Sequence, residues 1–221
     1  VMWATDGIDD RSVAFAARMM EQDVEVRIVD KEAVLSGHKL SRGSVVVIAM
    51  DNPEINNLPD IIKVVSEELN IPIMSLESGF GPEELPDWGG RHFRLLEKPQ
   101  IAILSHEGFN SYDVGVSLWS IDHHLGIRHS QLNASLASYG DLRRYNTIII
   151  PSGRSLNEYT LKILKDWVSQ GGTLIAHNSS TRSLASDKGI GSVKQLQNTF
   201  ENSKEYNFDL MREIYALDND I

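Results

Sequence analysis

The chain alternates between two patterns of apolar and polar residues, one typical of strands and one typical of helices. The run at 43–50 is almost continuously apolar and β-branched, which predicts a strand buried on both faces. At 9–22 the apolar residues recur three and four positions apart, which predicts an amphipathic helix. The same patterns predict further strands at 1–5, 24–30, 71–78, 99–105, 129–135, 145–153 and 173–178, and further helices at 58–70, 111–126 and 156–170.

Strands that are separated by helices favour an α/β fold with a parallel sheet flanked by helices. Continuous apolar runs are typical of strands in the middle of such a sheet, because both faces are covered. We expect four segments to be central parallel strands, namely 43–50, 99–105, 147–153 and 172–178.

A Gly- and Pro-rich stretch at 79–90 is the best internal boundary in the sequence. We therefore expect two units, a smaller α/β linking unit at 1–97 and a larger unit at 98–221. Because the sequence does not begin with methionine, we also expect it to be a piece of a longer protein.

Composition narrows the classes of function. The formal net charge is −10, and an acidic surface repels phosphate backbones, so we expect no nucleic-acid partner. No apolar stretch approaches the roughly 20 residues of a membrane span. The chain has no cysteine, which excludes disulfides, thiolate metal sites and cysteine nucleophiles.

Polar side chains follow three of the predicted strands, at 105–108, 152–154 and 177–180. In an open parallel sheet, ligands bind at the carboxyl ends of the strands. If the three strands are neighbours, these corners converge on one edge of the sheet. This edge is where the sequence places a candidate site.

The first corner carries His106 and Glu107, which could act as an acid–base pair. The alternative is that Glu107 only approaches the positive end of a helix. The polar residues at the start of the helix predicted at 111–126 are expected to cap it; they are Asn110, Ser111 and Asp113.

The other two corners offer binding groups and a possible nucleophile. Backbone N–H groups at Ser152 and Gly153 could form an oxyanion hole or anion site, or the segment could be a plain turn. Ser179 lies near the position of a nucleophile, but the residues beside it are not the small glycines that a nucleophile elbow needs. We expect no catalytic residue; the catalytic candidates are His106, Glu107 and Ser179, and the binding candidates are Ser152, Gly153, Arg154 and His177.

The histidines do not follow a metal-binding motif. His123 and His124 are adjacent and face different directions on a helix, and neither HExxH nor HxxE occurs. We expect no metal ion and no other cofactor in this chain.

Three segments together resemble a known family. They are PQIAILSHEGFNSYDVGVSLWSIDHHLGI at 99–127, DLRRYNTIIIPSG at 141–153 and LKDWVSQGGTLIAHNSS at 164–180. They are similar to a class I glutamine amidotransferase-like domain, and more narrowly to the version that follows the catalytic domain in large bacterial zinc carboxypeptidases of the carboxypeptidase A-like type. The resemblance implies a flavodoxin-like, class I glutamine amidotransferase-like fold for 98–221.

In true amidotransferases of this class, a cysteine occupies the corner after the GGTLIA-type strand, whereas HNSS stands there in this chain. The resemblance therefore implies a non-catalytic C-terminal accessory region of a zinc metallocarboxypeptidase. The zinc ion would lie in the preceding catalytic domain. The implied partners are that peptidase domain and, through it, a peptide substrate, and the implied location is periplasmic or secreted.

Two other classes of function remain open. One is a hydrolase that uses Ser179 or the pair of His106 and Glu107. The other is a two-lobed α/β module that binds a small molecule between 1–97 and 98–221.

Overall fold

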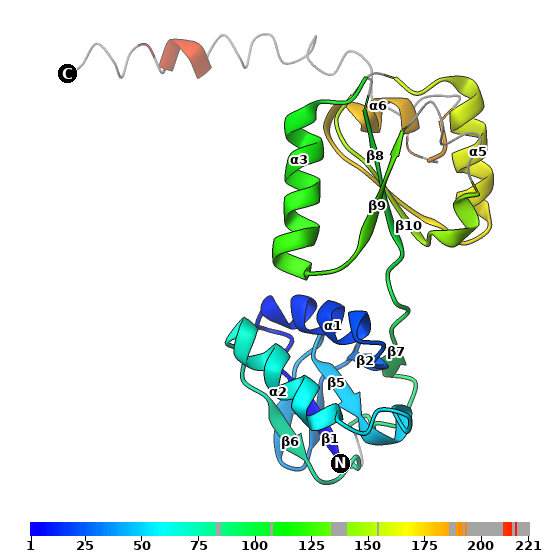
Figure 1. Cartoon of the computed structure of the whole chain (residues 1–221). Coiled ribbons are helices and arrows are strands. Elements are labelled where there is room, and N and C mark those ends of the chain that lie inside the picture. Colours follow the sequence, from blue (N-terminus) through cyan, green and yellow to red (C-terminus); the bar gives the residue numbers. More distant parts are fainter. Residues whose placement is uncertain are drawn as a thin grey trace.

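The chain is an α/β protein whose strands form two larger sheets and one short hairpin (Figure 1). The larger sheets have five and four strands, and the four-stranded sheet is parallel and flanked by helices, as predicted. The computed structural model describes residues 1–82, 85–106, 108–133, 141–153, 155–185, 189–191, 193, 210–213 and 215.

The five-stranded sheet is antiparallel throughout and has the order β6-β1-β5-β2-β7. The prediction that 43–50 forms a central parallel strand is therefore wrong in direction, because β5 is central but antiparallel to both neighbours. The strands are β1 (Met2–Thr5), β2 (Val26–Val29), β5 (Val45–Ile48), β6 (Met74–Leu76) and β7 (Phe93–Leu95).

The connections explain this arrangement. Helix α1 (Arg11–Glu21) joins β1 to β2, which run in the same direction but are separated by β5. Helix α2 (Leu58–Leu69) joins β5 to β6 across β1 in the same way. This is a split β-α-β arrangement. Alternating strands and helices thus fix the relative direction of the joined strands, but not which strands become neighbours.

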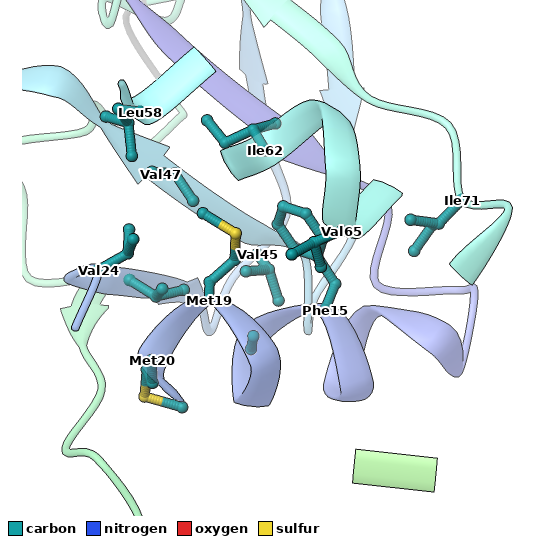
Figure 2. Close-up of a cluster of buried hydrophobic side chains, with 12 residues drawn as sticks. Phe15, Met19, Met20, Val24, Val45, Val47, Leu58, Ile62, Val65 and Ile71 are labelled. Carbon is teal, nitrogen blue, oxygen red and sulfur yellow. The ribbon is translucent and has the colours of Figure 1, made fainter. Parts of the chain in front are cut away.

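The predicted burial of β5 on both faces is confirmed. Val45 and Val47 pack against α1 and α2 in one apolar core, with Phe15 and Met19 at its centre (Figure 2). On the other face, Val46 packs against the hairpin of β3 (Ala33–Leu35) and β4 (His38–Leu40). An antiparallel strand can therefore be apolar throughout when a hairpin replaces the solvent on its second face.

The four-stranded parallel sheet has the order β11-β10-β8-β9. β8 and β10 are central, as predicted, whereas β11 is an edge strand in the part of the chain that the structure describes, and its side chains alternate between exposed and half-buried. The strands are β8 (Ile101–Ser105), β9 (His129–Asn133), β10 (Thr147–Ile150) and β11 (Thr173–Ala176).

Helices cover both faces of this sheet (Figure 1). On one side lies α3 (Ser111–Trp119), which continues into the π-helical segment η2 (Ser120–Leu125), and on the other lies α5 (Glu158–Ser169). α2 and α5 have 12 residues each, and no helix in the described residues is long and apolar enough to cross a membrane.

A capping residue begins α3, and glycines follow η2 and α5, close to the helix bounds that the sequence predicted. The Asn110 side chain accepts hydrogen bonds from the N–H groups of Tyr112 and Asp113, so Asn110 is the N-cap of α3. Gly126 ends η2 with a left-handed φ of 67°. A Cβ atom at Gly172 would lie 2.5 Å from the Trp167 ring, so only glycine fits there after α5.

Helix α1 contributes to the cores of both sheets. One face supplies Phe15 and Met19 to the first sheet, and Ala17 on another face packs with Ile101 and Ile103 of β8. Ion pairs also join the α1 region to the segments beside the second sheet. The Lys98 ammonium lies 2.7 Å from the Asp23 carboxylate, and Arg128 pairs with Glu21.

Candidate functional site

The carboxyl ends of β8, β10 and β11 lie side by side, because these strands are parallel neighbours. The three polar corners named from the sequence therefore share one edge of the sheet. Glu107 and Arg154, which were candidates at this edge, lie outside the described residues.

At the end of β8, the Ser105 hydroxyl lies 2.7 Å from His106 Nδ1. Ser105 is only 2% exposed, whereas His106 lies on the surface with a left-handed φ of 74°. The imidazole is thus held at one nitrogen by a buried hydroxyl, and a substrate has no access to that hydroxyl.

The loop that follows β8 crosses to the end of β10. The Asn110 N–H donates to the Ser152 carbonyl at 2.8 Å, and Phe109 forms a β-bridge with Gly153. The approach is so close that a Cβ atom at Gly153 would lie 2.7 Å from the Gly108 carbonyl oxygen. β9, the next strand along the chain, lies on one side of β8, and β10, the strand after it, lies on the other side. The gap between β8 and β10 is therefore the topological switch point, where open α/β sheets bind ligands, and the loop bridges it.

The Ser179 hydroxyl is held by the β10 corner. Its Oγ lies 2.9 Å from the Gly153 carbonyl, 3.0 Å from the Gly153 N–H nitrogen and 2.8 Å from the Ser152 hydroxyl. A hydroxyl has one proton and two lone pairs. Donation to the carbonyl and acceptance from the other two groups use all of them, and the Gly153 N–H, an oxyanion-hole candidate, is engaged by Ser179.

His177 points to α3 and not to Ser179. Its Nε2 lies 3.3 Å from the Ser117 hydroxyl, whose single proton is donated to the Asp113 carbonyl at 2.9 Å. Ser117 therefore accepts from His177, and the imidazole carries its proton at Nε2 when it makes this bond. In this arrangement His177 is a donor that ties β11 to α3, and it is not a base acting on Ser117.

Asn178, and not Ser179, has the left-handed backbone conformation at the turn after β11, with a φ of 56°. Its side-chain amide lies 3.3 Å from the Asp113 carboxylate. Sequence reasoning missed the site roles of Asn178, Asp113 and Ser117. The enrichment of asparagine at positive φ is the one signal that favoured Asn178 as the turn residue.

The arrangement at this edge is a set of mutual hydrogen bonds between loops. Ser180 adds another, from its hydroxyl to the Pro151 carbonyl. Within the described residues, no three His, Asp or Glu side chains are grouped to hold a metal ion.

Comparisons with known proteins add little. No family model and no curated protein matches this sequence. Part of the chain is similar to the solved structure of beta-galactosidase from Bifidobacterium adolescentis, with 17% sequence identity and a TM-score of 0.31. This similarity covers 38% of this chain and 41% of that chain, and a TM-score of this size carries no argument about fold or function.

Proposed function

We propose that this chain is a non-catalytic accessory region, structural or binding, of a zinc metallocarboxypeptidase whose catalytic domain lies outside this sequence. The observation that carries the non-catalytic part is the closed corner at Gly153. Its N–H and carbonyl are both bonded to Ser179, and the loop of Phe109 and Asn110 covers the switch point from the other side. The Ser179 hydroxyl and the Gly153 N–H, which a hydrolase would direct at a substrate, are instead hydrogen-bonded to each other.

Strand order supports a flavodoxin-like, amidotransferase-like fold for 98–221. Numbered along the chain, β9-β8-β10-β11 is the order 2-1-3-4, which is the beginning of the flavodoxin-like order. The split β-α-β sheet of the first part supports a second, smaller α/β unit in 1–97.

The turn at Asn178 supports the resemblance to amidotransferases without their chemistry. A nucleophile elbow is a strained strand-to-helix turn, and Asn178, the first residue of η4 (Asn178–Ser180) after β11, has the left-handed backbone of such a turn. The amide of asparagine is not a nucleophile of the thiol or hydroxyl type. The turn is thus consistent with an inherited shape that carries no reactive group.

Zinc and substrate belong to the catalytic domain in this proposal. The HxxE motif of the carboxypeptidase does not occur in the sequence. The partners would be that peptidase domain and the peptides that it cleaves, in a periplasmic or secreted location.

Expression of the longer natural protein, with and without 1–221, tests the proposal. We expect the longer protein to hold one zinc ion and to release C-terminal residues from peptides, and 1–221 alone to do neither. A stoichiometric zinc ion in 1–221 after dialysis would contradict the proposal. An upstream sequence that lacks HxxE followed by a later histidine would contradict it as well.

The competing hydrolase hypothesis is tested on the same chain. Activated esters and glutamine are offered to 1–221, to Ser179→Ala and to His106→Ala. We expect no turnover by any of them. Turnover by the unchanged chain that both substitutions abolish would establish a catalytic site at this edge of the sheet.

A further inference from the structure

The side of α3 that faces away from the second sheet carries an apolar stripe. Tyr112, Val116 and Trp119 follow each other at intervals of four and three residues, so they lie on one face of the helix. Their exposed fractions are 84%, 63% and 54%. The opposite side of α3 packs through Leu118 on the core around Ile103 (Figure 1). We call Tyr112, Val116 and Trp119 the outer stripe.

The two helices that flank the second sheet differ on their outer sides. Four of the six exposed residues of α5 are charged, namely Glu158, Lys162, Lys165 and Asp166. None of the five exposed residues of α3 is charged, and its one charged residue, Asp113, lies 3.3 Å from the Asn178 amide. A helix that is apolar all round is typical of burial on both sides. The outer stripe therefore has the composition of an interface core, in which aromatic residues are enriched and charged residues depleted.

Gly115 gives a second, independent indication. It is an exposed residue in the interior of α3, its φ is not positive, and no atom lies within 4 Å of the position of a Cβ atom. Glycine weakens a helix relative to alanine, and the packing of this chain around Gly115 does not require it. A glycine lets another molecule approach the backbone closely. The outer stripe thus combines a large aromatic side chain with an open space one helical turn away.

Trp119 is held in place before any partner binds. Its ring centroid lies 5.2 Å from that of His123 and 4.9 Å from that of His124. Both adjacent histidines contact one indole because η2, which follows Trp119, is π-helical. A side chain that is already ordered loses little conformational entropy when it binds.

We propose that the outer stripe is a self-association surface, on which α3 packs antiparallel against α3 of a second copy of this chain. Gly115 and Trp119 lie at equal distances on either side of Ser117. A two-fold axis near Ser117 therefore places Trp119 of each copy over Gly115 of the other, and the same contact forms twice. The stripe carries no charge, so two chains of net charge −10 can meet here without opposing like charges.

The area of the stripe sets the expected strength of the contact. A buried aromatic side chain contributes about 150 to 250 Å², so the exposed parts of the three residues supply about 400 Å² per copy and about 800 Å² per dimer. Stable complexes bury about 1,200 Å² or more. We therefore expect a reversible dimer with a dissociation constant of about 10 to 500 μM.

Sedimentation equilibrium of the 221-residue chain, from about 5 μM to about 1 mM, tests the proposal. Gly115→Gln should weaken dimerisation by about tenfold or more, because its side chain fills the space that Trp119 of the other copy needs. The thermal stability of the monomer should not fall, because glutamine is a better helix former than glycine. This variant therefore separates association from folding.

Val116→Lys should also weaken dimerisation by about tenfold or more, because it places two ammonium groups close to the two-fold axis. The matched control is Val13→Lys, because Val13 is an exposed valine of α1 outside the stripe. It adds the same charge and should change the dissociation constant by less than about twofold.

Single cysteine variants test the antiparallel orientation, because the chain has no cysteine of its own. Val116 lies one residue from the centre, so Val116→Cys should form a disulfide-linked dimer in an oxidising glutathione buffer. Tyr112 lies five residues from the centre, so its two copies stand about 15 Å apart along the helix axis. A disulfide needs Cα atoms within about 7 Å, so Tyr112→Cys should not form one.

Three results would overturn the proposal. A chain that stays monomeric up to about 1 mM would mean that the outer stripe is covered by a different protein. Equal weakening by Val13→Lys and Val116→Lys would place the contact elsewhere on the molecule. A disulfide-linked dimer of Tyr112→Cys but not of Val116→Cys would exclude the antiparallel pair.

Discussion

Each of the two sheets has a central strand that is buried throughout, β5 in the first and β8 in the second, yet the sheets use their polar residues differently. Beside the first sheet, the Asn52 side chain forms hydrogen bonds with the N–H and carbonyl of Glu25, before β2, and with the Ile48 carbonyl at the end of β5. The Arg27 guanidinium pairs with the Asp51 carboxylate through two of its nitrogens. At the second sheet, polar groups collect at one edge, where Ser152 and Ser179 meet. Neighbouring antiparallel strands end at opposite edges, whereas parallel strands all end at the same one. Strand direction thus explains why the second sheet, and not the first, brings polar residues together at one edge.

The largest expected effect comes from Val46→Asp, at a fully buried position in β5. An unpaired carboxylate there should lower the free energy of unfolding by about 4 kcal/mol or more. Because α1 belongs to both cores, we expect both sheets to lose their structure together, measured by NMR with signals from each sheet. Val13→Asp, at an exposed site, is the control. A native second sheet in the Val46→Asp chain would show that the two cores are independent.

Asn52→Ala should have the next largest effect. It removes three hydrogen bonds and leaves the N–H and carbonyl of Glu25 without this partner in a region where Asn52 itself is 5% exposed. We expect a loss of about 3 kcal/mol in urea unfolding. A loss below about 1 kcal/mol would mean that water replaces the amide, and the contrast between the sheets would weaken.

Gly153→Ala tests the closed corner of the second sheet. The new Cβ atom would meet backbone atoms of the crossing loop, so the loop must move, at a cost of about 2 kcal/mol. Gly115→Ala is the matched control, because nothing lies within 4 Å of a Cβ atom there, and it should stabilise α3 slightly. Equal stability of the two variants, measured by thermal unfolding, would contradict the tight crossing.

Element positions followed from the sequence because they depend on local patterns. The apolar periods placed α1 and β10, and Asn110 and Gly126 marked helix ends. The direction of β5 did not follow, because pairing between distant strands is set by the whole sheet. The hairpin at 33–40 was missed although Ser36 and Gly37, both with positive φ, form its two-residue turn.

The position of the candidate site could be predicted from the sequence, but the hydrogen-bond partners within it could not. Polar residues after parallel strands located the edge, since that depends only on strand direction. The partners of His177 and Ser179 did not follow, because they depend on distances of a few tenths of an ångström between loops that are remote in sequence.

The smallest expected effect is a loss of stability at low pH. The Arg143 guanidinium beside Asp141 lowers the pKa of that carboxyl from its usual 3.8 to about 2, and a hydrogen bond from His92 lowers the pKa of Asp30 beside the first sheet. A lowered pKa contributes stability that is present above pH 3.8 and lost as the pH falls toward 2. Arg143→Gln should raise the pKa of Asp141 toward its usual value, measured by NMR titration, and leave Asp30 unchanged. An unchanged Asp141 titration would show that the pair does not form in solution.

The double role of α1 also bears on how the protein can be divided. A chain that begins at 98 would lose Ala17 from the apolar cluster around Ile101, Ile103 and Ile127, and so expose a patch of branched side chains. Such patches drive aggregation. We expect the second sheet to be insoluble when it is produced without α1, and its solubility to return when the first 97 residues are restored.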